Sequence, residues 1–211
     1  MLFVTNEPLR SRNALAERLT QIGIPSTAAH VMTSAAIAAR VAGSLPGPAN
    51  RRALVVGPPA LHDEIKGAGF HLVTSEEAGE AEVVVVGGYE SFDYRELRAA
   101  ATAVRAGAHL LATGRDAIFP MPEGPWPATG TILAAIEIAG GTPAVVVGKP
   151  EKIMFDIACE TLAGCARIDV IGDHLIADIE GAKRAGLPTL RACEAARSIW
   201  TTMPPHRWTR V

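Results

Sequence analysis

Short apolar runs alternate with longer amphipathic segments along this chain, and the alternation predicts two kinds of secondary structure. The apolar runs are rich in β-branched side chains, which suits strands buried on both faces of a parallel sheet. They cover residues 2–4, 53–56, 83–86, 110–112, 144–147 and 168–171. The segments between them predict helices at residues 12–22, 34–42, 60–68, 95–106, 132–139, 151–162 and 179–185. Strand alternating with helix indicates an α/β fold, with a Rossmann-like parallel sheet and right-handed crossovers.

Glycine and proline mark the ends of these elements and the boundaries between larger units. Glycines follow several predicted helices, where a residue without a Cβ can end the helix. They are Gly23, Gly69, Gly107, Gly140 and Gly186. Two stretches rich in proline and glycine, residues 45–50 and 120–130, bracket a middle segment with its own alternation of strand and helix. We expect residues 1–48 and 131–211 to form one discontinuous core domain, into which residues 49–130 are inserted as a cap domain.

Composition narrows the class of protein. With 211 residues, of which 48% are hydrophobic and 20% charged, the chain can bury at least one core. A net charge of −2 without lysine or arginine clusters argues against nucleic acid as a partner. No apolar stretch approaches the roughly 20 residues of a membrane span. Cys159, Cys165 and Cys193 lack the spacing of a zinc site or a disulfide framework. We expect a cytoplasmic protein without nucleic-acid or membrane partners, and the sequence leaves homo-oligomer formation open.

The first candidate site follows the apolar run at residues 2–4, because ligands of open α/β sheets bind at the carboxyl ends of the strands. Thr5 and Asn6 come next, and a helix is predicted to begin near Ser11. A hydroxyl, an amide and neighbouring main-chain N–H groups can bind a phosphoryl oxygen. The alternative is structural, with Thr5 or Ser11 capping a turn or the helix.

The second candidate site follows residues 144–147, where the chain continues as Gly148, Lys149 and Pro150. Glycine allows close approach of the backbone, and lysine supplies a compact positive charge for an anion. Pro150 suits the first turn of the predicted helix. Taken by itself, such a lysine is more often a solvated surface residue.

The third candidate site is the loop after residues 168–171, which carries Asp173 and Asp178. Two carboxylates on one strand-to-helix loop suit Mg²⁺, which prefers oxygen ligands and keeps several waters. The structural alternative makes Asp178 a helix N-cap and Asp173 a turn residue. Taken together, however, the hydroxyl, the ammonium group and the paired carboxylates are the complementary parts of a magnesium and phosphate site.

In order and spacing, these residues resemble motifs of the haloacid dehalogenase superfamily, specifically its phosphatases with a large α/β cap. Residues 3–6 with residues 10–12 resemble that group's second motif, residues 147–150 its third, and residues 172–173 with 178–182 its fourth. The resemblance covers nearly the whole chain. It implies a haloacid-dehalogenase core with an inserted α/β cap, and activity on phosphoglycolate, glycerol phosphate, nitrophenyl phosphate or a nucleotide.

The resemblance also assigns roles to single residues. Thr5 and Asn6 would hold the transferring phosphoryl group, and Lys149 would bind the phosphate and the nucleophile. Asp173 would hold Mg²⁺, with Asp178 supporting the metal site.

The cap would choose the leaving group of the substrate. Its residues 113–116 are similar to a family segment that faces the substrate. The resemblance therefore implies that Arg115 and Asp116 bind the substrate, a small phosphate ester.

One motif of the family has no counterpart among these residues. The family's nucleophile lies in an Asp-x-Asp-Gly motif that should precede Thr5 by a whole strand and helix, whereas four residues precede Thr5. In addition, Gly114 stands where asparagine is usual and Ala177 where threonine is common. We expect a core that is incomplete at its N-terminus, with exposed apolar edges on the neighbouring strands.

Two functions of different classes follow. The first is a phosphomonoesterase with Mg²⁺ as cofactor, which hydrolyses a small ester such as glycerol phosphate or phosphoglycolate through an aspartyl-phosphate, the nucleophile being absent from this chain. The second is a truncated, catalytically inactive binding protein of the same fold. A dinucleotide-binding protein is a weaker third hypothesis, because no G-x-G-x-x-G follows the first predicted strand.

Overall fold

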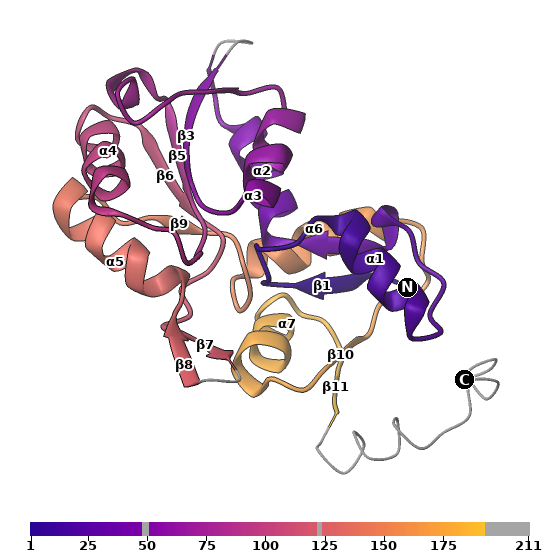
Figure 1. The fold of residues 1–211 in the computed structure, drawn as a ribbon. Coiled ribbons are helices and arrows are strands. Elements are labelled where there is room, and N and C mark those ends of the chain that lie inside the picture. The colour runs from indigo at the N-terminus through magenta and orange to yellow at the C-terminus, as the bar shows by residue number, and fades with distance from the viewer. Residues whose placement is uncertain (48–50, 122–123, 193–211) are drawn as a thin grey trace.

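The structure is a computed structural model, and it describes residues 1–47, 51–121 and 124–192. It contains a five-stranded parallel sheet with helices on both faces, two smaller parallel sheets and one antiparallel hairpin (Figure 1). Within these ranges, no helix has both the length and the apolar character needed to cross a membrane. The parallel sheets with their covering helices confirm the predicted α/β fold.

The five-stranded sheet has the strand order β4-β3-β5-β6-β9, and all neighbouring pairs are parallel. The strands are β3 (Arg52–Val56), β4 (His71–Leu72), β5 (Val83–Val86), β6 (His109–Ala112) and β9 (Val145–Val146). The central strand β5 consists of four valines, each at most 1% exposed. A strand buried on both faces reads as a continuous apolar run, which explains why the sequence pattern there is so plain.

Alternate side chains of β5 belong to two separate hydrophobic clusters, because successive side chains of a strand point to opposite faces. Val83 and Val85 pack with α2 and α3, whereas Val84 and Val86 pack with α4 and α5. Figure 1 shows these two pairs of helices on opposite sides of the sheet. The helices are α2 (Ser34–Ser44), α3 (Pro59–Gly67), α4 (Tyr94–Arg105) and α5 (Thr129–Gly140).

The remaining strands form smaller units. Two parallel pairs are β1 (Phe3–Thr5) with β2 (Val31–Thr33), and β10 (Val170–Gly172) with β11 (Thr189–Arg191). The antiparallel hairpin joins β7 (Ile118–Met121) to β8 (Gly124–Pro127). The other helical elements are α1 (Arg12–Gln21), η1 (Ala28–His30), η2 (Ala78–Glu80), α6 (Lys152–Thr161), the π-helix η3 (Leu175–Glu180) and α7 (Gly181–Arg184).

The predicted strands and helices are all present, with bounds that differ by a few residues. Four of the glycines predicted to end helices have positive φ angles: Gly23, Gly69, Gly107 and Gly186. The prediction for Gly140 is wrong, because Gly140 is the last residue of α5 and Gly141, with φ of 74°, follows it as the C-cap. Gly140 has a packing role instead, since a Cβ there would lie 2.8 Å from Cγ1 of Val104.

Strand β9 forms a strand pair across the predicted boundary between core and cap. It belongs to the predicted core segment, residues 131–211, yet it pairs with β6 of the predicted cap. Leu111 lies opposite Val145, and Ala112 lies opposite Val146. The division into residues 1–48 with 131–211 and residues 49–130 stays a prediction.

Candidate functional site

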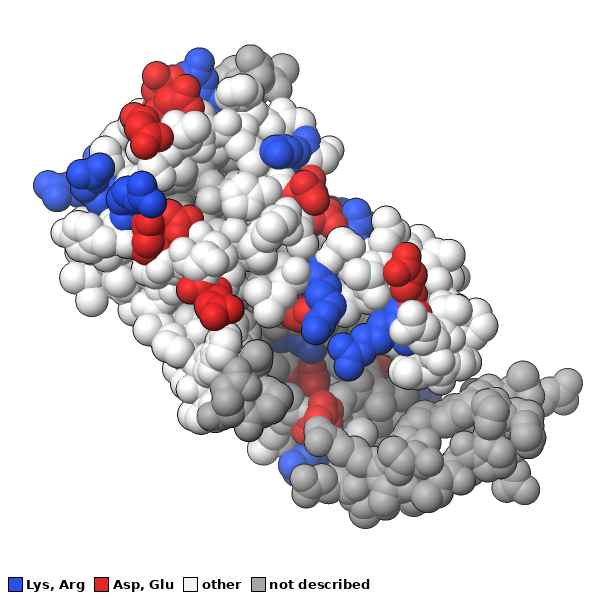
Figure 2. Space-filling view, in the orientation of Figure 1, with Lys and Arg blue, Asp and Glu red and all other residues white. Residues whose placement is uncertain are grey.

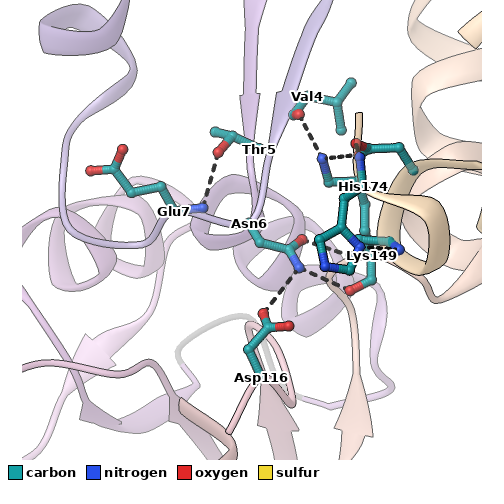
Figure 3. Close-up of polar contacts among 9 residues, drawn as sticks. Val4, Thr5, Asn6, Glu7, Asp116, Lys149 and His174 are labelled. Atoms are coloured by element: carbon teal, nitrogen blue, oxygen red, sulfur yellow. Dashed lines mark hydrogen bonds and ion pairs between the residues drawn. The ribbon is translucent and has the colours of Figure 1, made fainter. Parts of the chain in front are cut away.

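Residues from three strand ends, far apart in the sequence, meet at one place. Lys149 lies at its centre, close to Val4 and Asn6 (Figure 3). Its Nζ lies 2.6 Å from Oδ1 of Asp178 and donates a hydrogen bond of 3.1 Å to the main-chain oxygen of Val4. The Lys149 and Asp178 side chains are 14% and 11% exposed, so the ion pair is largely shielded from water. Such a pair needs these further hydrogen bonds to offset its lost hydration.

Asn6 holds the main chain of Lys149 through both ends of its side-chain amide (Figure 3). Its Oδ1 accepts the N–H of Lys149 at 2.8 Å, and its Nδ2 donates to the carbonyl of Lys149 at 2.8 Å. The main-chain oxygen of Asn6 accepts a hydrogen bond of 2.8 Å from the buried hydroxyl of Ser34, the first residue of α2. Asn6 therefore fixes Lys149 against the end of β1.

Gly148 makes this approach sterically feasible. A Cβ at Gly148 would lie 2.1 Å from the carbonyl oxygen of Thr113 and 2.8 Å from Oδ1 of Asn6. No side chain fits in that space, so the close backbone approach expected of this glycine is confirmed.

Thr5 lies at the end of β1 and is partly buried. Its Oγ1 accepts the N–H of Glu7 at 3.1 Å, and Oγ of Ser11 accepts the N–H of Ala14 at 3.2 Å at the start of α1. Both residues thus have the capping roles considered as alternatives. A hydroxyl that accepts one hydrogen bond still has its own proton to donate, so capping and phosphate binding by Thr5 are compatible.

The loop after β10 differs from its prediction. The sequence predicts a helix from residue 179, but the helical turn begins at Leu175 as a π-helix, a form that is frequent at functional sites. Its N-cap is His174, whose Nδ1 accepts the N–H of Ala177 at 3.0 Å, and not Asp178. Oδ2 of Asp178 accepts the N–H of His174 at 3.1 Å, so both oxygens of this carboxylate are engaged.

Asp173 follows Gly172 at the carboxyl end of β10 and is exposed. Among the residues that the structure describes, no group of three or more His, Cys, Asp or Glu side chains is arranged to hold a metal ion. Mg²⁺ nevertheless keeps several waters and often takes just one or two protein carboxylates. A metal-binding role for Asp173 stays a prediction, as does a supporting role for Asp178, whose oxygens accept hydrogen bonds from Lys149 and from the N–H of His174.

Arg115 and Asp116, the predicted substrate-binding residues, are both exposed but lie in different surroundings. Oδ2 of Asp116 is 3.4 Å from Nδ2 of Asn6, so Asp116 borders the site (Figure 3). Arg115 pairs with Glu137, with Nη1 2.9 Å from Oε2 and Nη2 2.6 Å from Oε1. This contact holds the pKa of Glu137 below its ordinary value and raises the pKa of Arg115.

Three contributors were not predicted from the sequence. They are the carbonyl of Val4, the hydroxyl of Ser34 and the carboxylate of Glu137. A carbonyl carries no sequence signal, and nothing distinguishes Glu137 from other acidic residues on helices. Ser34 directly follows the N-cap of α2, and a hydroxyl at the start of a predicted helix could have been considered as a candidate site residue.

Charges on the face shown in Figure 2 are mixed and not separated by sign. Several charged side chains near α1 form ion pairs, including Arg12 with Glu64 and Arg10 with Glu7, each at 2.7 Å. The visible face therefore has no extended area of one charge.

Comparisons with known protein families match both ends of the described chain. A family model described as haloacid dehalogenase-like hydrolase matches residues 1–71, and one described as HAD-hydrolase-like matches residues 146–191. The first segment contains Thr5 and Asn6, and the second contains Lys149, Asp173 and Asp178.

Individual relatives extend this similarity over nearly the whole chain. The D-glycerol 3-phosphate phosphatase of Mycobacterium tuberculosis is 37% identical over 201 residues, which cover 94% of this chain and 56% of that protein. Human chronophin is 37% identical over 201 residues, which cover 90% of this chain and 68% of chronophin. A crystal structure of the M. tuberculosis glycerol phosphate phosphatase in complex with magnesium has a TM-score of 0.83 at 36% identity, covering 90% of this chain and 57% of that one. The chain thus spans little more than half the length of the mycobacterial enzyme.

Proposed function

Because the chain belongs to the haloacid dehalogenase-like hydrolase family, we propose that its function is that of a magnesium-dependent phosphatase for small organic phosphate monoesters. Esters of the glycerol phosphate or phosphoglycolate type are the proposed substrates. The observation that carries the proposal is the meeting of Lys149, Asn6 and Asp178 at the ends of separate strands. A largely shielded ammonium group is suited to binding a phosphate.

In this proposal, each residue of the cluster has a distinct task. Lys149 attracts the phosphate and neutralises charge that develops during the reaction. Thr5 donates its hydroxyl to a phosphoryl oxygen, and Asn6 keeps Lys149 in position through the two hydrogen bonds to its main chain. Asp178 keeps the ammonium group directed toward the end of β1, where Val4 accepts its second hydrogen bond.

Asp173 would hold the magnesium ion, with water and the substrate as further ligands. When bound, the ion would polarise a phosphoryl oxygen and offset negative charge. The structure of a relative in complex with magnesium supports the choice of metal.

The proposed reaction proceeds through an aspartyl-phosphate on an aspartate that residues 1–211 do not supply. Atoms balance in two steps: the aspartate displaces the alcohol from phosphorus, and water then releases inorganic phosphate and restores the aspartate. The alternative is a catalytically inactive binding protein, which would keep the phosphate-binding residues and lack the nucleophile.

Location and partners are proposals of the same kind. We place the protein in the cytoplasm, because Cys159 and Cys165 are free thiols and exported proteins favour disulfides. Cys193 lies outside the described residues. A homo-oligomer and the absence of nucleic-acid and membrane partners stay predictions.

The test is hydrolysis of nitrophenyl phosphate with and without Mg²⁺, by this chain and by a version extended with the upstream coding sequence. We expect activity in the extended version and a loss of about a hundredfold in its Asp173→Ala variant. Asp169→Ala is the matched control, because Asp169 lies on the same segment but pairs with Arg167. Activity in the short chain that Asp173→Ala abolishes would place the nucleophile within residues 1–211. No activity in either version would favour the binding protein.

A further inference from the structure

The contacts of Arg115 differ from those expected of a substrate ligand. Both terminal nitrogens of its guanidinium bind the two oxygens of Glu137, in the bidentate geometry that makes such pairs strong and directional. The Glu137 side chain is 17% exposed, and its Oε1 also accepts the N–H of Ala144 at 2.8 Å. An anion that recruited Arg115 would therefore leave a largely buried carboxylate without its charge partner, which is costly.

The main chain around Arg115 is also fastened to the first turn of α5. The carbonyl of Asp116 accepts the N–H of Gly130 at 2.9 Å, and the carbonyl of Ala117 accepts the N–H of Ala128 at 3.0 Å. A Cβ at Gly130 would lie 2.4 Å from the carbonyl oxygen of Arg115, so loop and helix are in direct contact. The pair with Glu137 adds a second attachment, about two turns further along α5.

Two parts of the candidate site depend on this arrangement. Asp116, next in sequence to Arg115, is held 3.4 Å from Asn6. Ala144, bound by Glu137, directly precedes β9, and β9 leads to Lys149. The Glu137 carboxylate on α5 thus connects the loop of Asp116 with β9, the strand that precedes Lys149.

We propose that Arg115 and Glu137 are positioning residues, which anchor the loop of residues 113–117 and the start of β9 to α5 and so hold Asp116 and Lys149 at their places in the site. This inference rests on the proposed phosphatase function for its kinetic consequence, but not for its structural one. Asp116 then contacts the leaving group of the substrate, and Arg115 acts through the loop.

The structural test is hydrogen–deuterium exchange of this chain, followed at the amides of Ala128 and Gly130, which bind the loop carbonyls. We expect exchange to become about tenfold faster in Arg115→Ala and in Glu137→Gln, with no further increase in the double variant, because both changes remove one interaction. Arg115→Lys should restore part of the protection. Arg184→Ala is the matched control, since it removes an exposed ion pair with Glu180 and should leave these amides unchanged.

The kinetic test uses whichever version hydrolyses nitrophenyl phosphate. We expect KM to rise by a similar factor in Arg115→Ala and Glu137→Gln, and no further in the double variant. A lower KM in Glu137→Gln with a higher KM in Arg115→Ala would overturn the proposal, because a freed Arg115 would then be binding the anion. Unchanged exchange in Glu137→Gln would also overturn it. Absence of hydrolysis in the unaltered protein would contradict the phosphatase proposal. The exchange experiment would still test whether Arg115 and Glu137 hold the loop of residues 113–117 to α5.

Discussion

The five-stranded sheet and the small parallel sheet of β10 and β11 are stabilised in different ways. In the large sheet, the valines of β5 are almost completely buried between two layers of helices. In the small sheet of β10 and β11, Ile171 and Leu190 lie opposite each other and are 70% and 61% exposed. Apolar burial therefore stabilises the large sheet, whereas two apolar side chains of the small sheet are largely exposed.

The candidate site takes one residue from each of these regions, Lys149 after β9 and Asp178 after β10, and a third, Asn6, from the end of β1. Asn6, Lys149 and Asp178 are joined by hydrogen bonds and an ion pair whose partners come from β1, from the segment after β9 and from the π-helix. Such contacts fix the positions of these side chains relative to one another, while the large sheet provides the scaffold of the fold. The comparison teaches that changes in the scaffold should affect stability most, and that changes in the polar cluster should affect the site.

The largest expected effect comes from a pair of substitutions, one in each region. Leu111→Ala removes a side chain that is 1% exposed on β6, and should lower the free energy of unfolding by about 3 kcal/mol. Ile171→Ala shortens a largely exposed side chain on β10 and should change it by less than about 0.5 kcal/mol. Urea denaturation of both variants measures the difference. Equal losses would contradict the contrast between the two regions, and would mean that Ile171 is covered in solution.

A smaller effect is expected from Asp178→Asn, which keeps the shape of the side chain and removes its charge. Lys149, 14% exposed, would lose the partner of its ammonium group, at a cost of about 2 kcal/mol of unfolding free energy. Asp156→Asn is the control, because its ion pair with Lys152 is exposed and should contribute little. Equal stability of the two variants would mean that the ion pair of Lys149 and Asp178 contributes no more than an exposed one.

The smallest expected effect is the dependence of the anchor on pH. The contact with Arg115 lowers the pKa of Glu137 below its ordinary value of 4.5 in the folded protein. A carboxyl with a depressed pKa contributes stability above its unfolded pKa, and this contribution disappears as the pH falls through the folded pKa. Wild type should therefore exceed Glu137→Gln in stability by less than about 1 kcal/mol at neutral pH, because Arg115 is half exposed. The difference should vanish in acid, and a difference independent of pH would rule out this charge effect.

The fold was largely predictable because its main strands are buried on both faces. The run of valines at Val83–Val86 indicates a strand buried on both faces, which is what the structure has. Glycines with positive φ follow several of the predicted helices. The strands that were missed have weaker signals: β2 and β11 have three residues each, β4 has two, and the hairpin of β7 and β8 contains proline. The membership of β9 in the large sheet depends on tertiary pairing, which no local pattern reveals.

The site was predictable where chemistry coincides with a strand end. Asn6, Lys149 and Asp178 do meet, but their contacts differ from simple expectations because main-chain groups take part. The N-cap role of His174 was missed, since histidine is an uncommon cap and the helix begins in π form. The meeting of Asn6, Lys149 and Asp178 does not test their roles. The roles predicted for all the site residues stay predictions: Thr5, Asn6, Arg115, Asp116, Lys149, Asp173 and Asp178.

The double hydrogen bond between Asn6 and Lys149 also bears on how the chain folds. It joins residues 143 positions apart, and contacts of such long separation form slowly because a large loop must close first. Strands β3, β5 and β6 all precede Lys149 in the sequence, so they can pair during synthesis before this lysine emerges. The order of the chain therefore makes the scaffold an early product of folding and the polar cluster around Lys149 a late one.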